Sequence, residues 1–396
     1  MKMTGGNPSR FLPIVNNEGA SMLTPTTRIQ QLQIESGRRI LVTSDIHGYL
    51  SYLQGVLEKA NFSEKDILII VGDMLEKGPD SLGTLRYVME LCKKGNVVPL
   101  LGNVDAYRLQ VIDELNEENA LGFYDYLVAL REWCGSSFYD ELAAECGYTI
   151  ASPADLLSTK PDVLAHFAPE FDFLLSLPTI VETQNYVFVH GGLREKRVED
   201  NRNRPFYDLT KYDAFMTNTP HRFDKYVVVG HWPVPLYDDK KEQLNPVMNR
   251  EKRIISIDGG CGVKDERQLN LLILPDINCD VEDITHLYYE DFPTIRALED
   301  QAASEDSVYV SWMTREIRLL ERGEEWSEIQ HIASGKKLRV PNAYIRRDNE
   351  CRDYTDYVLP VKAGDMLSVF FKTETGCIAK KDGVVGWYYG PYEDVK

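Results

Sequence analysis

The stretch Leu41-Val-Thr-Ser-Asp-Ile-His-Gly48 decides the fold of the first part of this chain. An apolar run over 40–42 ends abruptly in polar residues that include Asp45 and His47. This pattern is typical of a buried strand that presents ligand side chains at its carboxyl end. A carboxylate and an imidazole two residues apart at such a point can bind one cation. The stretch therefore predicts a strand-end metal site.

The same pattern recurs further along the chain. Apolar runs over 66–71, 96–101, 186–189 and 226–229 lead into Asp73, Asn103, His190 and His231, respectively. The early runs alternate with segments of helical spacing at 49–60 and 81–93. Alternating strands and helices predict an α/β domain with a largely parallel sheet at its start. Because the carboxyl ends of parallel strands meet at one edge of a sheet, the polar residues are expected to converge.

The remaining segments differ in composition. Residues 1–37 are mostly polar and predict an N-terminal arm, and a domain over 38–292 follows. Within this domain, residues 106–177 are rich in Leu, Tyr, Phe and Glu and predict a helical insertion. An acidic stretch over 293–307 is typical of a connector. Short apolar runs separated by turn residues over 308–396 predict a small C-terminal all-β domain, a barrel or a sandwich.

Composition excludes several classes of protein. The 396 residues carry a net charge of -18, which argues against general nucleic-acid binding and against binding to acidic membranes. There is no apolar stretch of signal-peptide or membrane-spanning length. Seven scattered cysteines without a Cys-x-x-Cys pair are typical of reduced thiols. We therefore expect a cytoplasmic protein.

The strand-end residues together form a donor set for metals. Two carboxylates, one amide and three imidazoles exceed what one octahedral ion needs once its waters are counted. Such a set suits two cations that share one bridging carboxylate. Two cations about 3.5–4 Å apart can lower the pKa of a shared water and hold both oxygens of an in-line displacement.

These residues lie in motifs that carry a resemblance to a known family. The motifs are Asp45-Ile-His-Gly, Gly72-Asp-Met-Leu-Glu-Lys-Gly78, Gly102-Asn-Val-Asp105, His190-Gly-Gly-Leu193 and Gly230-His231. In order and spacing they resemble the metallophosphoesterases, above all the serine/threonine phosphoprotein phosphatases and their bacterial relatives, including diadenosine tetraphosphate hydrolases. The resemblance covers about residues 38–290. It implies a two-sheet α/β sandwich flanked by helices.

The resemblance also implies roles for individual residues. Asp45, His47 and a bridging Asp73 would hold one metal, and Asp73, Asn103, His190 and His231 would hold the other. A hydroxide bridging the two metals would attack phosphorus. Manganese is the expected ion, although oxygen and imidazole ligands also suit iron and zinc. The expected substrate is a phosphorylated protein or a nucleotide.

Three positions depart from the family pattern. Val104 stands where the family has the histidine that donates a proton to the leaving group, and Glu76 replaces the aspartate that pairs with that histidine. Valine cannot transfer a proton, so general acid catalysis is missing or is supplied elsewhere, with Asp105 as the nearest substitute. Lys77 replaces an arginine and keeps the positive charge without the bidentate fork. We therefore expect a preference for substrates with good leaving groups.

Structural alternatives exist for several candidates. Asn103 could simply cap the helix that follows it. Lys77 could be an ordinary surface lysine instead of a phosphate contact. Arg194, just after His190-Gly-Gly-Leu193, could be a second phosphate anchor or a solvated loop residue.

Two functions compete at this point. The first is hydrolysis of a phosphate ester by a dinuclear metal enzyme. The alternative is a catalytically weak or inactive metal-binding protein that senses phosphate and recruits partners through its C-terminal β domain. Val104 and Lys77 motivate the alternative, whereas the presence of all six ligand-type residues favours the enzyme. The aromatic stretch Gly386-Trp-Tyr-Tyr-Gly-Pro391 could bind an extended peptide or cover a small core.

Overall fold

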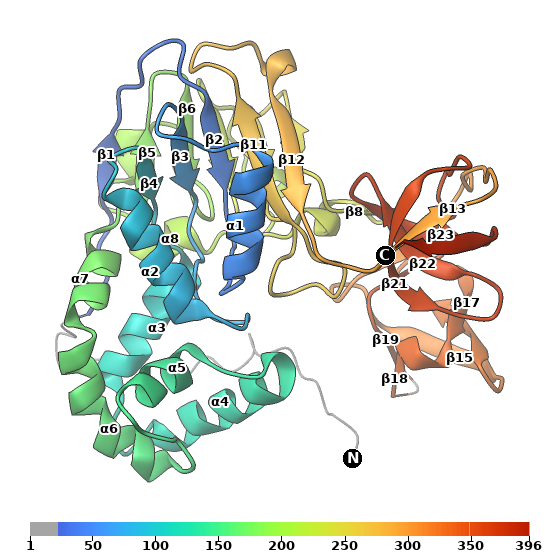
Figure 1. The fold of residues 1–396 in the computed structure, drawn as a ribbon, viewed down its shortest axis with the longest axis horizontal. Coiled ribbons are helices and arrows are strands. Elements are labelled where there is room, and N and C mark those ends of the chain that lie inside the picture. The colour runs from blue at the N-terminus through green and yellow to red at the C-terminus, as the bar shows by residue number, and fades with distance from the viewer. Residues whose placement is uncertain (1–22, 348, 396) are drawn as a thin grey trace.

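The fold is described from a computed structural model, which places residues 23–347 and 349–395 (Figure 1). It has two parts, a sandwich of two sheets with flanking helices and a smaller group of β-sheets beside it. Among the described residues, no helix combines the length and the apolar character that a membrane crossing requires.

Two mixed sheets form the sandwich. The first has the order β12 (Thr285–Tyr289), β11 (Leu269–Leu274), β2 (Ile40–Thr43), β3 (Ile67–Ile70) and β4 (Val97–Pro99). The second has the order β1 (Ile29–Gln31), β5 (Ile180–Glu182), β6 (Tyr186–Val189), β7 (Tyr226–Val229), β10 (Ile254–Ser256) and β9 (Val247–Asn249). Strands β2, β3 and β4 are parallel, as are β6, β7 and β10. The parallel α/β start expected from the sequence is confirmed.

Successive side chains of β2 point to opposite faces of the first sheet and so contribute to two different hydrophobic cores. In β2, Ile40 and Val42 point into the core between the sheets, where they meet Phe188 and Val228 of the second sheet. Leu41 points the other way, into the core beneath the helices. Because both faces of β2 are buried, the strand reads as a continuous apolar run.

Helices cover the outer face of the first sheet and gather below one end of the sandwich (Figure 1). They are α1 (Leu50–Lys59), α2 (Ser81–Cys92), α3 (Asn103–Glu114), α4 (Ala120–Cys134), α5 (Phe138–Glu145), α6 (Pro153–His166) and α7 (Ala168–Ser176). Helix α4 ends at Gly135, whose φ of 92° favours glycine, and helix α6 begins after its N-cap residue Ser152. The segment over 106–177 is thus helical, as expected.

The beginning of the chain differs from the expected arm. Residues 1–22 of that arm lie outside the described residues. Residues 29–31 form β1, which pairs in parallel with β5 at the edge of the second sheet. Three residues with a single apolar side chain give too weak a periodicity to predict a strand. The partner strand, rather than local sequence, specifies β1.

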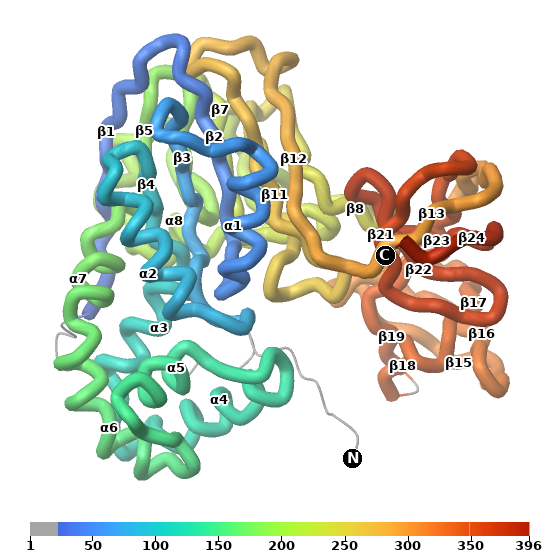
Figure 2. Tube along the Cα trace, in the orientation of Figure 1, coloured from blue at the N-terminus to red at the C-terminus, as the bar shows by residue number. Residues whose placement is uncertain are grey.

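The second part of the molecule also begins earlier than expected. Its main sheet has the order β24 (Tyr392–Val395), β13 (Thr294–Ala297), β21 (Met366–Lys372), β22 (Cys377–Lys381), β23 (Val384–Tyr388) and β8 (Glu242–Gln243). Strand β13 lies within the stretch predicted as a connector, and β8 comes from the middle of the sandwich segment. We call residues 294–395 together with β8 the C-terminal β domain. In Figure 2, β8 lies at the junction of the two parts.

Smaller sheets complete the C-terminal β domain. A three-stranded sheet consists of β15 (Ile317–Arg322), β16 (Trp326–His331) and β17 (Lys337–Pro341). Two short pairs are β14 (Tyr309–Val310) with β20 (Tyr354–Thr355) and β18 (Ile345–Arg346) with β19 (Glu350–Cys351). The domain is all-β in its strands, and closure into a barrel stays a prediction.

Candidate metal centre

Three acidic and imidazole side chains meet at the ends of β2 and β3. Each of Asp45, His47 and Asp73 offers one ligand atom, and these three atoms lie within 4.8 Å of one another. All three residues are buried. Asp45 and His47 follow β2, and Asp73 follows β3, so parallel pairing of the two strands brings them together. This is the convergence expected from the sequence.

Asn103, His190 and His231 form a second group beside the first. Asn103 begins α3 after β4, while the two histidines follow β6 and β7. The terminal amide atom of Asn103 that faces these histidines lies 3.0 Å from His190 Nε2 and 2.9 Å from His231 Nδ1. Although Asn103 starts the helix, the cap residue is Gly102, so the capping alternative does not explain the asparagine. The two sheets of the sandwich each contribute to this group.

Asp73 lies between the two groups. Its Oδ2 atom is 3.7 Å from His47 Nε2 and 3.3 Å from His190 Nε2. Its other oxygen, Oδ1, accepts a hydrogen bond of 2.8 Å from the Val104 backbone N–H. That bond orients the carboxylate, so Oδ2 occupies the position a bridging ligand would need.

Each imidazole has one nitrogen engaged away from the cluster. His47 Nδ1 lies 3.0 Å from the Leu75 carbonyl and His190 Nδ1 lies 2.7 Å from the Val71 carbonyl. His231 Nε2 lies 2.8 Å from Asp213 Oδ1. Because these oxygens can only accept, they hold the proton on that nitrogen. The opposite nitrogen of each ring then faces the cluster, where it could donate a lone pair to a cation that displaces its proton.

The backbone is held in an unfavourable conformation at these positions. Six non-glycine residues of the motifs have a positive φ: Asp45 (54°), His47 (50°), Asp73 (52°), Glu76 (68°), Lys77 (69°) and His231 (65°). Each such residue costs on the order of 1–3 kcal/mol, and such strain gathers at functional sites. The surrounding sheets must supply this energy, which indicates that the positions of these side chains matter.

Two glycines of the motifs are required by close approach. A Cβ at Gly102 would lie 2.1 Å from Asp73 Oδ1, and a Cβ at Gly230 would lie 2.2 Å from Asp45 Oδ2. Neither carboxylate has room to move, because Asp73 is bonded to Val104 and Asp45 Oδ2 accepts from the His231 N–H at 3.0 Å. Glycine therefore precedes Asn103 and His231 so that the carboxylates can pack against the backbone.

The donor set fits divalent cations. Around Asn103 stand two imidazole lone pairs and the Thr210 carbonyl at 3.0 Å, all of which are electron-pair donors. The Asn103 amide can donate to these atoms through its NH₂ group, or it can turn its oxygen to them, in which case a bound cation would satisfy the whole set. Burial and the Lys77 ammonium lower the pKa of His47 to about 3, so His47 is neutral and ready to ligate. Burial disfavours the charged form of His190, but Asp73 and Asp45 raise its pKa to about 10. The two carboxylates thus attract positive charge to this point.

Lys77 lies at the cluster rather than on the open surface. Its Nζ is 3.1 Å from His47 Nε2. Burial lowers the pKa of Lys77, and Asp73 and Asp45 partly oppose that effect. The surface-lysine alternative is therefore not what the structure shows.

Glu76, which stands where the family has the aspartate of its proton-donor pair, binds a different partner. Glu76 Oε2 forms an ion pair with Arg108 Nε at 2.6 Å, and both side chains are almost fully buried. Glu76 Oε1 accepts from the Phe138 N–H at 3.0 Å. The guanidinium of Arg108 stacks over Tyr126, 4.4 Å from the ring centroid. Glu76 thus connects the loop that follows Asp73 to α3 and α5. Its carboxylate is occupied by Arg108 and the Phe138 N–H rather than by a histidine at position 104.

Asp105 does not face the cluster. One oxygen of its carboxylate accepts from the Met74 and Leu75 N–H groups at 2.9 and 3.0 Å, and the other accepts from the Gly102 N–H at 3.1 Å. Burial and the neighbouring Asp73 raise its pKa to about 7. Asp105 has no exposed surface, so this arrangement suits a positioning role rather than the proton-donor role expected from its place in the sequence.

Arg194 lies beside the cluster rather than in it. Its Nε donates to the Asp208 carbonyl at 2.7 Å, and its guanidinium stacks on Tyr212 at 3.7 Å from the ring centroid. Its charge helps to lower the pKa of Asp213, after the larger effect of the His231 hydrogen bond.

Two further carboxylates lie at the site: Asp213, which sequence reasoning missed, and Asp258, which ends a predicted strand but was given no role in the site. Asp213 holds His231, and its segment has no motif that would reveal this. Asp258 is buried, accepts from the Gly260 N–H at 2.8 Å, and has a pKa well above its usual range because of burial and the Asp45 charge. Its place at the end of the apolar run over 254–257 was the available signal.

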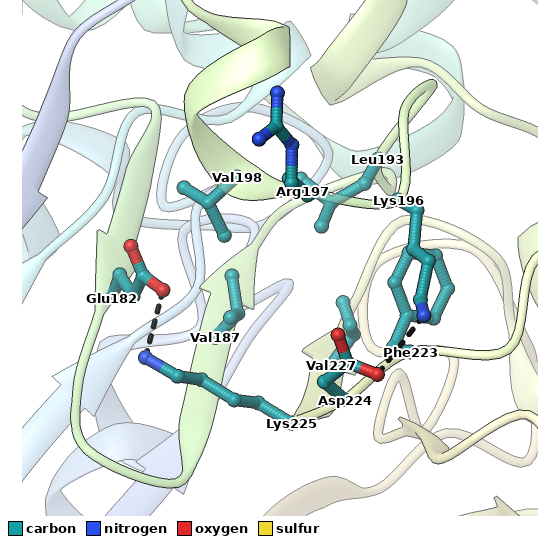
Figure 3. A pocket seen from close by; sticks show the side chains of 10 residues that line it. All are labelled: Glu182, Val187, Leu193, Lys196, Arg197, Val198, Phe223, Asp224, Lys225 and Val227. Carbon is teal, nitrogen blue, oxygen red and sulfur yellow. Dashed lines mark hydrogen bonds and ion pairs between the residues drawn. The ribbon is translucent and has the colours of Figure 1, made fainter.

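A separate pocket of about 150 Å³ lies over β6 and β7 and is lined by none of the candidate residues (Figure 3). Its lysines are neutralised: Lys225 Nζ lies 2.7 Å from Glu182 and Lys196 Nζ lies 3.0 Å from Asp224 (Figure 3). The pocket therefore offers no unpaired charge for a phosphate group.

Comparison with known proteins places the chain among phosphoesterases. It is 32% identical over 153 residues to a symmetrical bis(5'-nucleosyl)-tetraphosphatase of Vibrio cholerae serotype O1, which covers 38% of this chain and 44% of that protein. It is 37% identical over 70 residues to serine/threonine-protein phosphatase 1 of Salmonella typhimurium, which covers 17% of this chain and 32% of that protein. The chain thus spans less than half the length of these curated relatives.

Solved structures and a family model were compared as well. A protein serine/threonine phosphatase of Saccharomyces cerevisiae aligns with a TM-score of 0.40 and 13% identity, covering 68% of this chain and 84% of that chain. The family model described as calcineurin-like phosphoesterase matches residues 38–257, which is more than half of the chain and includes all six strand-end residues. The chain therefore belongs to the calcineurin-like phosphoesterase family.

Proposed function

We propose that this protein hydrolyses a phosphate ester with two divalent cations. The observation that carries the proposal is the convergence of five lone-pair donors around Asp73, with the proton-bearing nitrogens of the three imidazoles turned outward. Asp45, His47 and Asp73 would hold one cation, and Asp73, Asn103, His190 and His231 the other. Bound cations would supply an acidic water and neutralise phosphate oxygens. Manganese is the proposed ion.

The chain's own residues then decide what the site can do with a phosphate. Lys77, next to His47, can contact an anionic oxygen of the substrate. Arg194 is a weaker candidate for such a contact because Tyr212 and Asp208 already hold it. Val104 and the buried Asp105 leave the leaving-group side without a proton donor of the family type, which would otherwise contribute about 10²–10⁴-fold. Substrates that need little protonation are therefore favoured.

We propose a nucleotide or a phosphorylated protein as the substrate class. The relatives support both substrate classes. One is named a symmetrical bis(5'-nucleosyl)-tetraphosphatase and another a serine/threonine-protein phosphatase. Cleavage of a phosphoanhydride releases a phosphate, which leaves as a stabilised anion, and so suits a site without a general acid better than release of a serine alkoxide does. The nucleotide is thus the better match to Val104.

The test compares leaving groups. We expect turnover of para-nitrophenyl phosphate or bis-para-nitrophenyl phosphate with added manganese, and little turnover of an alkyl phosphate. Asp73→Asn should abolish turnover, whereas Asp224→Asn, the same change in an exposed ion pair, should not. Equal rate constants for aryl and alkyl esters, with chemistry limiting, would contradict the leaving-group argument.

The alternative of a metal-binding scaffold is less well supported. A decayed site usually loses ligands, whereas here all six ligand-type residues are present and each imidazole keeps its hydrogen-bond partner. The aromatic stretch over 386–391 could bind a peptide mainly through Tyr389, which is 50% exposed, because Trp387 and Tyr388 are buried. Manganese binding without turnover of either nitrophenyl ester would favour the scaffold.

A further inference from the structure

A buried ionic cluster joins the sandwich to the C-terminal β domain. Lys264 is almost fully buried, and its Nζ lies 2.6 Å from Glu242 Oε1. The same ammonium donates to the Asp353 carboxylate and to the Tyr309 hydroxyl, the latter at 2.5 Å. Lys264 belongs to the sandwich segment, whereas its partners belong to the C-terminal β domain. One lysine is therefore held entirely by the other part of the molecule.

Strand β8, which carries Glu242, is built into the sheet of the C-terminal β domain. Gln243 and Glu242 pair with Val384 and Val385 of β23. The next residue, Leu244, donates its N–H to the Gly383 carbonyl at 2.8 Å and lies in the hydrophobic core of that domain. Separation of the two parts would break this pairing and expose the core. The junction is thus a shared structural element and not a flexible link.

The loop that ends at Lys264 packs against the metal centre. A Cβ at Gly262 would lie 2.6 Å from the Cβ of His47, so the loop backbone touches that ligand. Cys261 Sγ lies 3.7 Å from the carbonyl of Ile46, between the two β2 ligands. The N–H groups of Val263 and Lys264 both donate to the Gly260 carbonyl, at 3.1 and 2.8 Å. Lys264 therefore ends the same tight turn that presses on His47.

The cluster is strong enough to set the position of this loop. Removal of the ammonium would leave the carboxylates of Glu242 and Asp353 facing each other, and an uncompensated charge is costly in a buried setting. A second buried lysine, Lys380, fixes the following residues, since its Nζ donates to the Glu266 carbonyl at 2.8 Å and pairs with Glu290. The end of the loop is thus anchored from the C-terminal β domain on both sides.

We propose that Lys264 is a positioning residue through which the C-terminal β domain holds the loop over 258–264 against His47. The C-terminal β domain is then required for tight cation binding on the His47 side of the centre. This inference rests on the proposed function, because it assumes that His47 ligates a cation. It gives the C-terminal β domain a role at the site itself, distinct from recruitment of a peptide.

Manganese titration calorimetry of the full chain tests the proposal. We expect Lys264→Met to raise the dissociation constant for Mn²⁺ about tenfold, the low end of what loss of outer-sphere support costs. Lys264→Arg, which keeps the charge among the same partners, should restore most of the affinity. Lys160→Met is the control, because Lys160 Nζ also donates to backbone carbonyls, those of Asp113 and Leu115 at the C-terminal end of α3, far along the chain from the loop over 258–264. It should bind Mn²⁺ like the wild type.

Hydrogen exchange supplies a readout that does not depend on the metal. In metal-free Lys264→Met, the amides of Val263 and Lys264 should lose protection, while the amides of β2 keep theirs. If Lys264→Met does not fold, the double variant Glu242→Gln/Lys264→Met takes its place, since it removes one facing carboxylate with the ammonium. The same criteria then apply to the double variant.

The outcomes separate the two proposals. Wild-type affinity in folded Lys264→Met, or in the double variant that takes its place, would overturn the coupling and leave the metal centre intact. Weaker binding in Lys264→Arg as in Lys264→Met would also overturn it, because charge would then not be the cause. Failure of the wild-type protein to bind Mn²⁺ would overturn the proposed function and this inference with it. Loss of affinity and of loop protection in Lys264→Met, with both retained in Lys264→Arg, supports the coupling.

Discussion

The contact between Asp213 and His231 allows a sharp test of the metal centre. Asp213 Oδ1 lies 2.8 Å from His231 Nε2 and should fix the imidazole so that Nδ1 faces Asn103. Loss of such an outer carboxylate typically costs 10–100-fold in metal affinity. Because the Asp213 side chain is 58% exposed, solvent screens its charge, and the low end applies. Asp213→Ala should therefore weaken Mn²⁺ binding about tenfold, or about 1.4 kcal/mol.

The measurement is the dissociation constant for Mn²⁺, obtained by calorimetric titration of the metal-free protein with MnCl₂. Asp213→Asn keeps an acceptor oxygen for the His231 N–H but loses the charge, so its affinity should lie between those of Asp213→Ala and the wild type. Asp224→Asn changes the same charge in the exposed pair with Lys196 and serves as the control. Equal affinities for Asp213→Ala, Asp224→Asn and the wild type would refute the assignment of His231 as a ligand.

Three further predictions follow from the geometry. Val104→His should raise turnover of an alkyl phosphate by up to about 10²-fold and leave para-nitrophenyl phosphate nearly unchanged, as steady-state kinetics would show; a parallel rise for both esters would contradict the leaving-group argument. Arg108→Met should cost about 3–5 kcal/mol in the free energy of unfolding, measured with urea, because Glu76 is left buried and unpaired, and Glu76→Gln in the same chain should recover part of the loss. Burial opposes ionisation of Asp66, but hydrogen bonds from Arg39 and Ser63 lower its pKa. The ionised carboxylate therefore stabilises the fold fully above the ordinary aspartate pKa, and this stabilisation is lost as the pH falls through the lower pKa of the folded state. Asp66→Asn should thus cost about 2 kcal/mol at pH 7, and urea titrations should show this difference shrink below about pH 4; a difference that is the same at both pH values would contradict the ion-pair origin.

Local sequence was informative where a strand ends in a ligand. Asp45 and His47 could be found because a buried strand needs an apolar run and the site needs polar residues directly after it. The glycines beside the ligands belong to the same signal, since only glycine allows the carboxylates so close to the backbone. These constraints act within a few residues, so they leave a readable pattern.

Contacts between distant segments left no such pattern. Asp213 became visible only where its segment meets His231, and Asp105 only where its carboxylate meets the backbone after Asp73. The short strands β1 and β13 form because partners in β5 and β21, which lie 151 and 74 residues away in the pairs Ile29↔Ile180 and Thr294↔Ser368, offer them hydrogen bonds.

The sequence by itself therefore determined the family, the α/β strand order at the start of the chain and the set of ligand-type residues. Only the tertiary structure decided which of these side chains face one another, that Glu76 pairs with Arg108, and that β8 pairs with β23 of the C-terminal β domain. The physical reason is range. Strand ends and tight turns are specified by neighbours along the chain, whereas buried ion pairs such as Lys264 with Glu242 depend on segments that meet only after folding.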